Sequence, residues 1–185
     1  MPAISNIIKA HRPDLSPYES LYKHFHSNPE LSFQEKETAA AIQSHLKKLG
    51  SYSINPNIGG TGTAAVLENG KGTTVLLRAD IDALPVEENT GLPYASKKRM
   101  LDSEGVEKPV MHACGHDMHF TSLLAAAELL LKAKNEWQGT LILCFQPAEE
   151  KGAGAQAMVD DGLYDRVPVP DVVLGAHVMP YRAGE

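Results

Sequence analysis

The sequence is poor in cysteine, with only Cys114 and Cys144 among 185 residues. Two cysteines cannot form the dense disulfide framework of a small secreted protein, so a reducing compartment is expected. No apolar run approaches the ~20 residues that are needed to span a bilayer. The first residues also lack the basic start and long apolar stretch of a secretory signal. We therefore predict a cytoplasmic protein that has no membrane partner.

The sequence also lacks an excess of positive charge: 17 basic residues stand against 23 acidic ones, and the formal net charge is −6. A protein that binds nucleic acid needs a basic face to displace counterions, so we predict no nucleic-acid partner. Apolar residues make up 43% of the chain and charged residues 22%, which is ordinary for a globular protein. The length is sufficient for one substantial hydrophobic core.

Helical patterns occur in three parts of the chain. The first covers residues 17–50 and is interrupted at Asn28-Pro29, so that a second helix starts near Gln34 and ends before Gly50. Ser16 is the expected N-cap, and Glu19 completes a capping box. The other two helices are predicted at residues 117–133 and 153–158. Three histidines in or beside the first helical region are interpreted as partly exposed structural residues: His24, His26 and His45.

Strands are predicted at residues 63–67, 73–77, 139–146 and 172–178. Asn69-Gly70 predicts a tight hairpin turn between the first two strands. The glycine-rich residues 59–62 are interpreted as a turn, because no Gly-Lys-Ser/Thr follows them to make a phosphate loop. The polar residues 89–111 are expected to form an excursion or loop. The alternation of strands and helices predicts an α/β fold with a largely parallel sheet.

Four polar clusters follow or end predicted strands: residues 78–82, 112–119, 146–150 and 175–178. In open α/β sheets the functional site lies at the carboxyl ends of the strands, so these clusters are expected to meet. In the first cluster, Asp80 and Asp82 face the same side of an extended chain and repel each other unless a cation or a proton intervenes. The alternative is a solvated loop in which Arg78 balances one carboxylate.

The second cluster, His112 to His119, carries a cysteine, an aspartate and three histidines. Cys114 and His116 can point the same way if the chain bends at Gly115, and thiolate and imidazole are good ligands for zinc-like ions. Asp117 is expected either to orient a ligand or to cap the following helix, and His119 to contact substrate. A nucleophilic Cys114 activated by a histidine is the rival interpretation.

The third and fourth clusters complete the pattern. Adjacent acids at the mouth of a sheet, such as Glu149 and Glu150, suit a division of labour in which one binds metal and the other takes a proton from water. The alternative is an exposed acidic loop, which is common in acidic proteins. His177, near the end of an apolar strand, would alone be interpreted as a hydrogen-bonded core histidine. Together, one cysteine, several histidines and several carboxylates are the components of a two-metal hydrolytic site. Cys144 lies mid-strand and is expected to pack in the core.

Several of these motifs occur in one order along the chain: R-A-D-I-D-A-L-P, M-H-A-C-G-H-D-M-H, F-Q-P-A-E-E and G-A-H-V. Upstream of the third motif, H-S-N-P-E-L-S-F-Q-E and T-G-L-P-Y also match. The chain closely resembles the amidohydrolase branch of the aminoacylase and carboxypeptidase metallopeptidase family. That branch includes indole-acetyl-amino-acid hydrolases, hippurate hydrolases and N-acetyl-diaminopimelate deacetylases. The resemblance covers nearly the whole chain.

The resemblance implies metal-dependent hydrolysis of the amide bond of small N-acyl amino acids. It implies two divalent ions, zinc or manganese, held by Cys114, His116, Glu150 and His177. It also implies Glu149 as the general base. Asp82 falls where the wider family keeps an acid that orients the site.

The resemblance also implies a zinc-exopeptidase-like catalytic domain with a mixed sheet, interrupted by a lid or dimerisation domain. Residues 1–185 are then the N-terminal portion of that catalytic domain. The lid domain, a further histidine ligand and the rest of the catalytic domain would lie beyond it. The segment 97–109 is longer than is typical of the family. A homodimer is left open for the intact protein. The alternative is that this chain is a truncated, metal-binding but catalytically inactive remnant.

Overall fold

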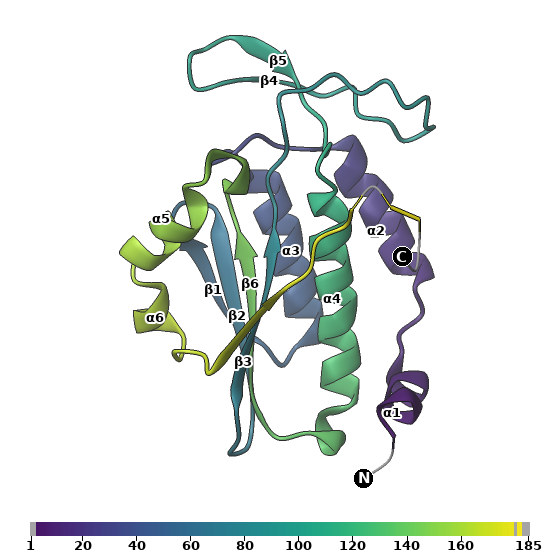
Figure 1. Cartoon of the computed structure of the whole chain (residues 1–185), viewed down its shortest axis with the longest axis vertical. Helices are drawn as coiled ribbons and strands as arrows, with labels where there is room; N and C mark the ends of the chain where they lie inside the picture. The colour runs from purple at the N-terminus through teal and green to yellow at the C-terminus, as the bar shows by residue number, and fades with distance from the viewer. Residues whose placement is uncertain (1–2, 180, 183–185) are drawn as a thin grey trace.

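The computed structural model describes residues 3–179 and 181–182, which form a layered α/β structure (Figure 1). The strands are β1 (Ser53–Ile58), β2 (Gly62–Asn69), β3 (Thr74–Asp80), β4 (Arg99–Leu101), β5 (Glu107–Pro109), β6 (Gly139–Gln146) and β7 (Val172–Gly175). The α-helices are α1 (Ile4–His11), α2 (Ser16–Ser27), α3 (Lys36–Leu49), α4 (His116–Lys132), α5 (Gly154–Asp160) and α6 (Leu163–Arg166). No helix in the described ranges is long and apolar enough to cross a bilayer.

The main sheet has five strands in the order β1-β2-β6-β3-β7. Its β6, β3 and β7 strands are parallel to one another, whereas β1 and β2 join them through antiparallel pairing. The predicted class, an α/β fold with a mixed sheet flanked by helices, is therefore confirmed. Since the parallel strands end at one edge, the chain segments that follow them are brought to a common place.

The predicted hairpin at Asn69-Gly70 is wrong. The turn exists, and Gly70 has the positive φ of 81° that such turns require. However, β6 lies between β2 and β3 and pairs with both. The physical reason is burial: β6 is apolar on both faces and is buried along nearly its whole length, so it takes the centre of the sheet. Local turn chemistry cannot anticipate a strand that arrives 70 residues later in the chain.

Strand β1 was not predicted, because its sequence S-I-N-P-N-I is polar and contains Pro56. Its place at the edge of the sheet explains this, since proline is tolerated where one side of the strand needs no ladder hydrogen bonds. The glycine-rich residues 59–62 form the turn between β1 and β2, as predicted. The predicted loop at 89–111 contains a short two-stranded hairpin, β4–β5, that projects beyond the end of the sheet (Figure 1).

Alternate residues of the strands face two separate apolar layers, as the two-residue period of a strand requires. Leu141, Leu143 and Phe145 of β6 pack with α2, α3 and α4 on one face. Ile142 and Cys144 pack with α5 and α6 on the other face. Cys144 is therefore a core residue, as predicted. Figure 1 shows the two helical layers on either side of the sheet.

Helices α1 and α6 were not predicted, α3 starts at Lys36 and not near Gln34, and the predicted cap of α2 is wrong. The interruption near Asn28 and the stop at Gly50 are confirmed, because α2 ends at Ser27 and α3 ends with Gly50 in the left-handed conformation. Ser16 is not the N-cap; it is already helical. Its N–H and its hydroxyl both donate to Asp14 Oδ1, at 3.0 and 2.8 Å. Of the two N–H groups that the capping box would have served, that of Ser16 donates to Asp14 and that of Glu19 donates to the Leu15 carbonyl oxygen at 2.8 Å.

Candidate metal centre

The parallel strand ends bring the polar clusters of the sequence together. Asp80 at the end of β3 lies beside Gln146 at the end of β6, and Arg78 lies beside Gly175 of β7. The loop before α4 approaches the same edge, because a ring nitrogen of His116 lies 2.9 Å from the carbonyl oxygen of Asp82. The predicted meeting of the four clusters at one sheet edge is therefore borne out by the fold.

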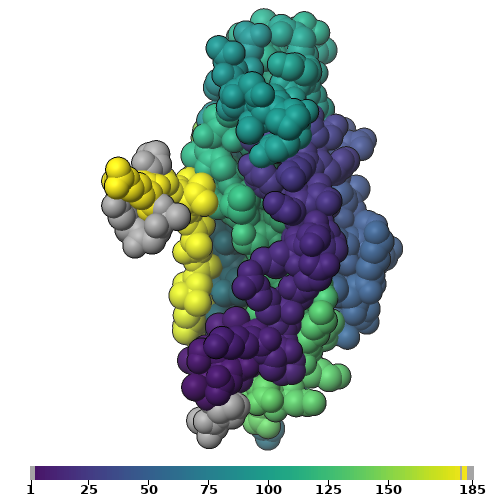
Figure 2. Space-filling view, turned by 90° about the vertical axis from the view of Figure 1, so that its right-hand side faces the viewer, coloured from purple at the N-terminus to yellow at the C-terminus, as the bar shows by residue number. Residues whose placement is uncertain are grey.

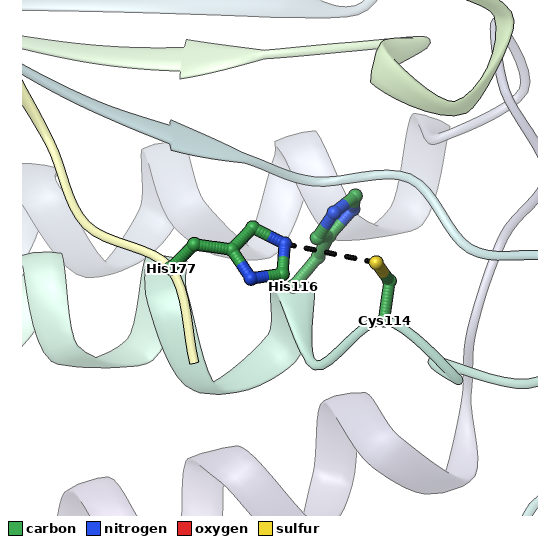
Figure 3. Close-up of side chains that lie close together, drawn as sticks. All are labelled: Cys114, His116 and His177. Carbon is green, nitrogen blue, oxygen red and sulfur yellow. Dashed lines mark hydrogen bonds between the residues drawn. The ribbon is translucent and has the colours of Figure 1, made fainter. Parts of the chain in front are cut away.

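Three candidate ligands face one another across this edge (Figure 3). Cys114 Sγ lies 3.6 Å from His177 Nε2, and the His116 ring centroid is 5.8 Å from that of His177. His177 comes from the segment after β7, which ends at Gly175 and not at residue 178 as expected. His177 is exposed, so it is not a core histidine.

The bend that brings Cys114 and His116 together depends on Gly115, as the sequence indicated. Gly115 has φ 78° and precedes the first residue of α4. A Cβ at this position would lie 2.6 Å from Val178 Cγ2, which is the residue after His177. The glycine therefore serves two purposes: it permits the left-handed backbone and it lets the His177 segment approach.

Two acidic groups flank the buried imidazole of His116. Its Nε2 lies 3.6 Å from Glu149 Oε2 and 4.0 Å from Glu150 Oε1. The two carboxylates differ in exposure: the side chain of Glu149 is 38% exposed and that of Glu150 is 17% exposed. Glu149 therefore faces the open side of the site, and Glu150 faces inward.

Asp82 orients the other side of the imidazole. His116 Nδ1 lies 2.9 Å from the Asp82 carbonyl oxygen and 3.3 Å from its Oδ1, so it is the nitrogen that carries a donated proton. Asp82 Oδ2 accepts hydrogen bonds from the Ser32 hydroxyl, at 2.7 Å, and from the Glu150 N–H, at 3.1 Å. Asp82 thus contacts both His116 and Glu150 and fixes their relative positions, and His116 Nε2 is left directed at the site.

The site contains buried polar atoms that have no hydrogen-bond partner: His116 Nε2 and Glu150 Oε1. An orphaned buried polar atom is costly and calls for a ligand. Atoms of three overlapping residue groups lie within 4.8 Å of one another, and His116 belongs to all three. They are Cys114–His116–His177, His116–Glu149–Glu150 and Asp80–His116–His119. Sulfur, imidazole and carboxylate together suit zinc-like divalent ions, so the residues present fit such a group.

The electrostatics of the site favour a cation. Burial and the nearby Glu150 and Glu149 carboxylates raise the pKa of the Cys114 thiol. Burial raises the pKa of Asp80 to about 6. Burial lowers the pKa of His116, but its hydrogen bond to Asp82 and the Asp80 charge outweigh this, so the pKa is raised. The site therefore stabilises positive charge at the position where a cation would lie.

Two residues of this cluster have roles that the sequence did not predict. His119, expected to contact substrate, is buried, and its Nε2 accepts the Val178 N–H at 3.0 Å. It therefore anchors the segment that carries His177. Burial lowers the pKa of His119 to about 4. Asp117 does not cap α4 at its N-cap; its Oδ2 lies 2.6 Å from His26 Nδ1. The interpretation of His26 as partly exposed is wrong, because it is buried between Asp117 and Glu88.

The comparison with known protein families agrees with this geometry. Residues 76–184, which contain all the candidate ligands, match the family described as peptidase family M20/M25/M40. The chain belongs to this family. The motifs that suggested the amidohydrolase branch therefore pointed to the right family.

Relatives within the M20 family carry the names of amide hydrolases. The chain is 46% identical over 165 residues to a hippurate hydrolase of Campylobacter jejuni, and the match covers 89% of this chain and 40% of the relative. It is 46% identical over 159 residues to an N-acetyl-L-cysteine deacetylase of Bacillus subtilis, covering 85% of this chain and 35% of the relative. The chain thus spans well under half of the length of these relatives.

A solved structure of an M20 protein has the same fold. The Bacillus subtilis YXEP protein, described as a dinuclear metal-binding peptidase of the M20 family, superimposes with a TM-score of 0.77 at 36% identity. The match covers 93% of this chain and 44% of that protein.

Proposed function

We propose that the intact protein hydrolyses the amide bond of N-acyl amino acids or related small amides in a metal-dependent reaction. The observation that carries this proposal is the convergence of Cys114, Glu149, Glu150 and His177 on the unpartnered Nε2 of buried His116. The names of the M20 relatives support the substrate class.

In this proposal Cys114, His116, Glu150 and His177 hold two divalent ions, zinc or manganese. A bound divalent cation lowers the pKa of water and polarises an acyl carbonyl, so that a carboxylate becomes an effective base near neutral pH. His116 Nε2 and Glu150 Oε1 have no hydrogen-bond partner, and Cys114 Sγ and His177 Nε2 lie 3.6 Å from each other in the same site. The dinuclear description of the YXEP protein supports a pair of ions.

Glu149 is proposed as the general base. Its carboxylate accepts the proton of the attacking water and later returns it to the departing amine, so no covalent intermediate with the protein is needed. Its greater exposure compared with Glu150 supports this assignment, since a base must reach the substrate side of the site. Asp82 is proposed to keep His116 in the tautomer whose Nε2 is free to bind a cation.

Residues 1–185 are proposed to be the N-terminal portion of the catalytic domain, with a lid or dimerisation domain and a further histidine ligand supplied elsewhere. The 40% coverage of the hippurate hydrolase relative supports this. The chain alone is then a metal-binding but inactive remnant. We further propose that the intact protein forms a homodimer and acts on a small-molecule substrate.

The decisive experiment replaces the base. In the intact protein, Glu149→Gln is expected to lower kcat for N-acetyl amino acids by about 10²–10⁴-fold while the metal content stays unchanged. Glu68→Gln is the matched control, because Glu68 is exposed and lies near the opposite end of the sheet. Hydrolysis rates and metal analysis are compared across the three proteins. Full activity in Glu149→Gln would exclude this residue as the base.

A second candidate, a cysteine hydrolase, is favoured by the Cys114 Sγ to His177 Nε2 distance of 3.6 Å. The same assays distinguish the cysteine hydrolase from the metal-dependent hydrolase when a strong chelator is added. Activity that survives the chelator favours the nucleophile, whereas activity that is lost and then restored by zinc or manganese favours the metal centre. Thiol alkylation does not discriminate, because it would also block a ligand.

A further inference from the structure

The turn that carries Glu149 has a strained backbone. Ala148, the residue immediately before it, has φ 47° and ψ 42°, which is the left-handed region. That region is unfavourable for a residue with a Cβ, and such strain persists only where the surroundings hold it in place. Ala148 is fully buried. Some contact must therefore fix its peptide group.

The contact comes from Glu35, which lies more than a hundred residues earlier in the sequence, directly before α3. Its Oε1 accepts the Ala148 N–H at 2.9 Å. The same oxygen accepts the N–H of Phe33, also at 2.9 Å, and Phe33 is a second non-glycine residue with positive φ, 64°. Its Oε2 accepts the Thr61 hydroxyl at 2.5 Å. One carboxyl group thus joins two left-handed residues and the β1–β2 turn.

Glu35 is 0% exposed, and none of the ion pairs among the described residues involves it. A buried carboxyl group is costly, and burial accordingly raises its pKa. The hydrogen bonds to Ala148, Phe33 and Thr61 offset that cost only in this arrangement. An apolar residue would fill the same space, but it would leave the Ala148 N–H without an acceptor.

The turn is held on both sides of the proposed base. Glu35 holds the N–H of the residue before Glu149, and Asp82 holds the N–H of the residue after it, Glu150, at 3.1 Å. Asp82 is in turn held by the hydroxyl of Ser32. The segment of residues 32–35 therefore supports both ends of the turn.

We propose that Glu35 is a positioning residue that fixes the Glu149 carboxylate by holding the strained Ala148 peptide. This inference rests on the proposed role of Glu149 as the base. The hydrogen bonds of the Glu35 carboxyl group go to Phe33, Thr61 and Ala148, and none goes to a candidate ligand. The loss of Glu35 should therefore impair the reaction step more than it impairs metal or substrate binding.

The test compares three substitutions in the intact protein. Glu35→Gln keeps an oxygen for the Ala148 N–H and offers an amide donor to Thr61, so kcat should stay within about threefold of the wild type. Glu35→Ala leaves the N–H unpaired, and kcat should fall by about 10²-fold, with KM and metal content nearly unchanged. Thr61→Val is the matched control: it removes a hydrogen bond to the same carboxyl group but leaves Ala148 held. It should lower the melting temperature and spare kcat.

A second readout does not depend on activity. Hydrogen exchange of the Ala148 amide in this chain should remain slow in the wild type, Glu35→Gln and Thr61→Val, and become fast in Glu35→Ala. If Glu35→Ala does not fold, Glu35→Asp replaces it, because the shorter side chain keeps a carboxyl group but draws its oxygens away from the Ala148 N–H. An inactive wild type with the expected exchange pattern would contradict the proposed function and leave the positioning contact standing.

Three results would overturn the proposal. Glu35→Gln could be as damaging as Glu35→Ala, which would assign the effect to charge. Thr61→Val could lower kcat as much as Glu35→Ala, which would assign it to general loss of structure. The Ala148 amide could exchange equally fast with and without Glu35, which would remove the proposed contact.

Discussion

His26 illustrates how much a single buried residue can depend on its partners. Its Nδ1 lies 2.6 Å from Asp117 Oδ2, and its Nε2 lies 3.1 Å from Glu88 Oε1. Both neighbours are acceptors when ionised, so both ring nitrogens must donate, and the ring carries a positive charge. The hydrogen bond to Asp117 is the main cause that raises the pKa of His26 to about 9; burial opposes it and Glu88 adds to it.

This pKa predicts a pH-dependent contribution to stability. The pKa of His26 in the folded state, about 9, lies above the ordinary value of 6.5, so folding favours the protonated ring. The contribution of His26 is therefore complete below pH 6.5 and is lost as the pH rises through about 9. Urea unfolding of the wild type and His26→Gln should differ by on the order of 2 kcal/mol near pH 6, and the difference should shrink by pH 9. If the difference in unfolding free energy stayed constant from pH 6 to pH 9, a protonated His26 between Asp117 and Glu88 would be contradicted.

At the level of single residues, the sequence was better at indicating which side chains belong to the site than at indicating which partners surround each of them. Asp82 and Glu149 stood out as acids that follow predicted strands and belong to the motifs that carry the family resemblance, and the structure places both beside His116. The motif containing Ser32 and Glu35 was recognised, but no role followed from it. Neither residue has a sequence neighbour that reveals its partner, since Asp82 and Ala148 are far along the chain.

At the level of elements, the site depends on how α4 begins. The helix starts at His116, directly after the left-handed Gly115, so Cys114 stays outside the helix and His116 is its first residue. The two side chains can then face the same ion, which a spacing of two residues within a helix would prevent. His119, one turn further, holds the segment after β7 through the Val178 N–H.

Substitution of Gly115 tests this arrangement. Gly115→Ala places a Cβ 2.6 Å from Val178 Cγ2, so the segment that carries His177 must shift, and we expect zinc affinity to fall by roughly tenfold, or about 1.4 kcal/mol. Gly105→Ala is the control: its φ is 76°, but nothing lies within 4 Å of an added Cβ. It should cost similar stability and leave zinc affinity unchanged in calorimetric titrations. Equal losses of affinity in both variants would show that the approach of Val178 is unimportant.

At the level of the whole molecule, the strand β7 and the segment after it form one edge of the described structure, seen as a ridge in Figure 2. Val172, Val173 and Leu174 are each at least 41% exposed, so this edge is less well packed than the rest of the sheet. His177 sits on this segment. The candidate site is therefore completed by the segment that follows the least buried strand of the sheet.

Metal binding should consequently stabilise the chain as a whole, because an ion that joins Cys114, His116 and His177 ties β7 to α4. At a metal concentration about a hundredfold above Kd, the gain is about 2.7 kcal/mol, or roughly 5–10 °C in melting temperature. Differential scanning calorimetry of the 185-residue chain with zinc, manganese and chelator measures this shift. An unchanged melting temperature would contradict the metal site.

The same samples should show no turnover of N-acetyl amino acids. Turnover comparable to that of a longer protein would contradict the proposal that this chain alone is inactive.

The sequence by itself determined the α/β class, most helices and strands, and the residues at the ends of the parallel strands. These features follow from local periodicity and from the chemistry of rare residue types, which act over a few neighbouring positions. Only the tertiary structure decided that β6 separates β2 from β3, that His26 is buried between Asp117 and Glu88, and that Glu35 holds Ala148. Each of these depends on a partner that is distant in the chain, and the free energy that selects it comes from burial and hydrogen bonding in the assembled fold.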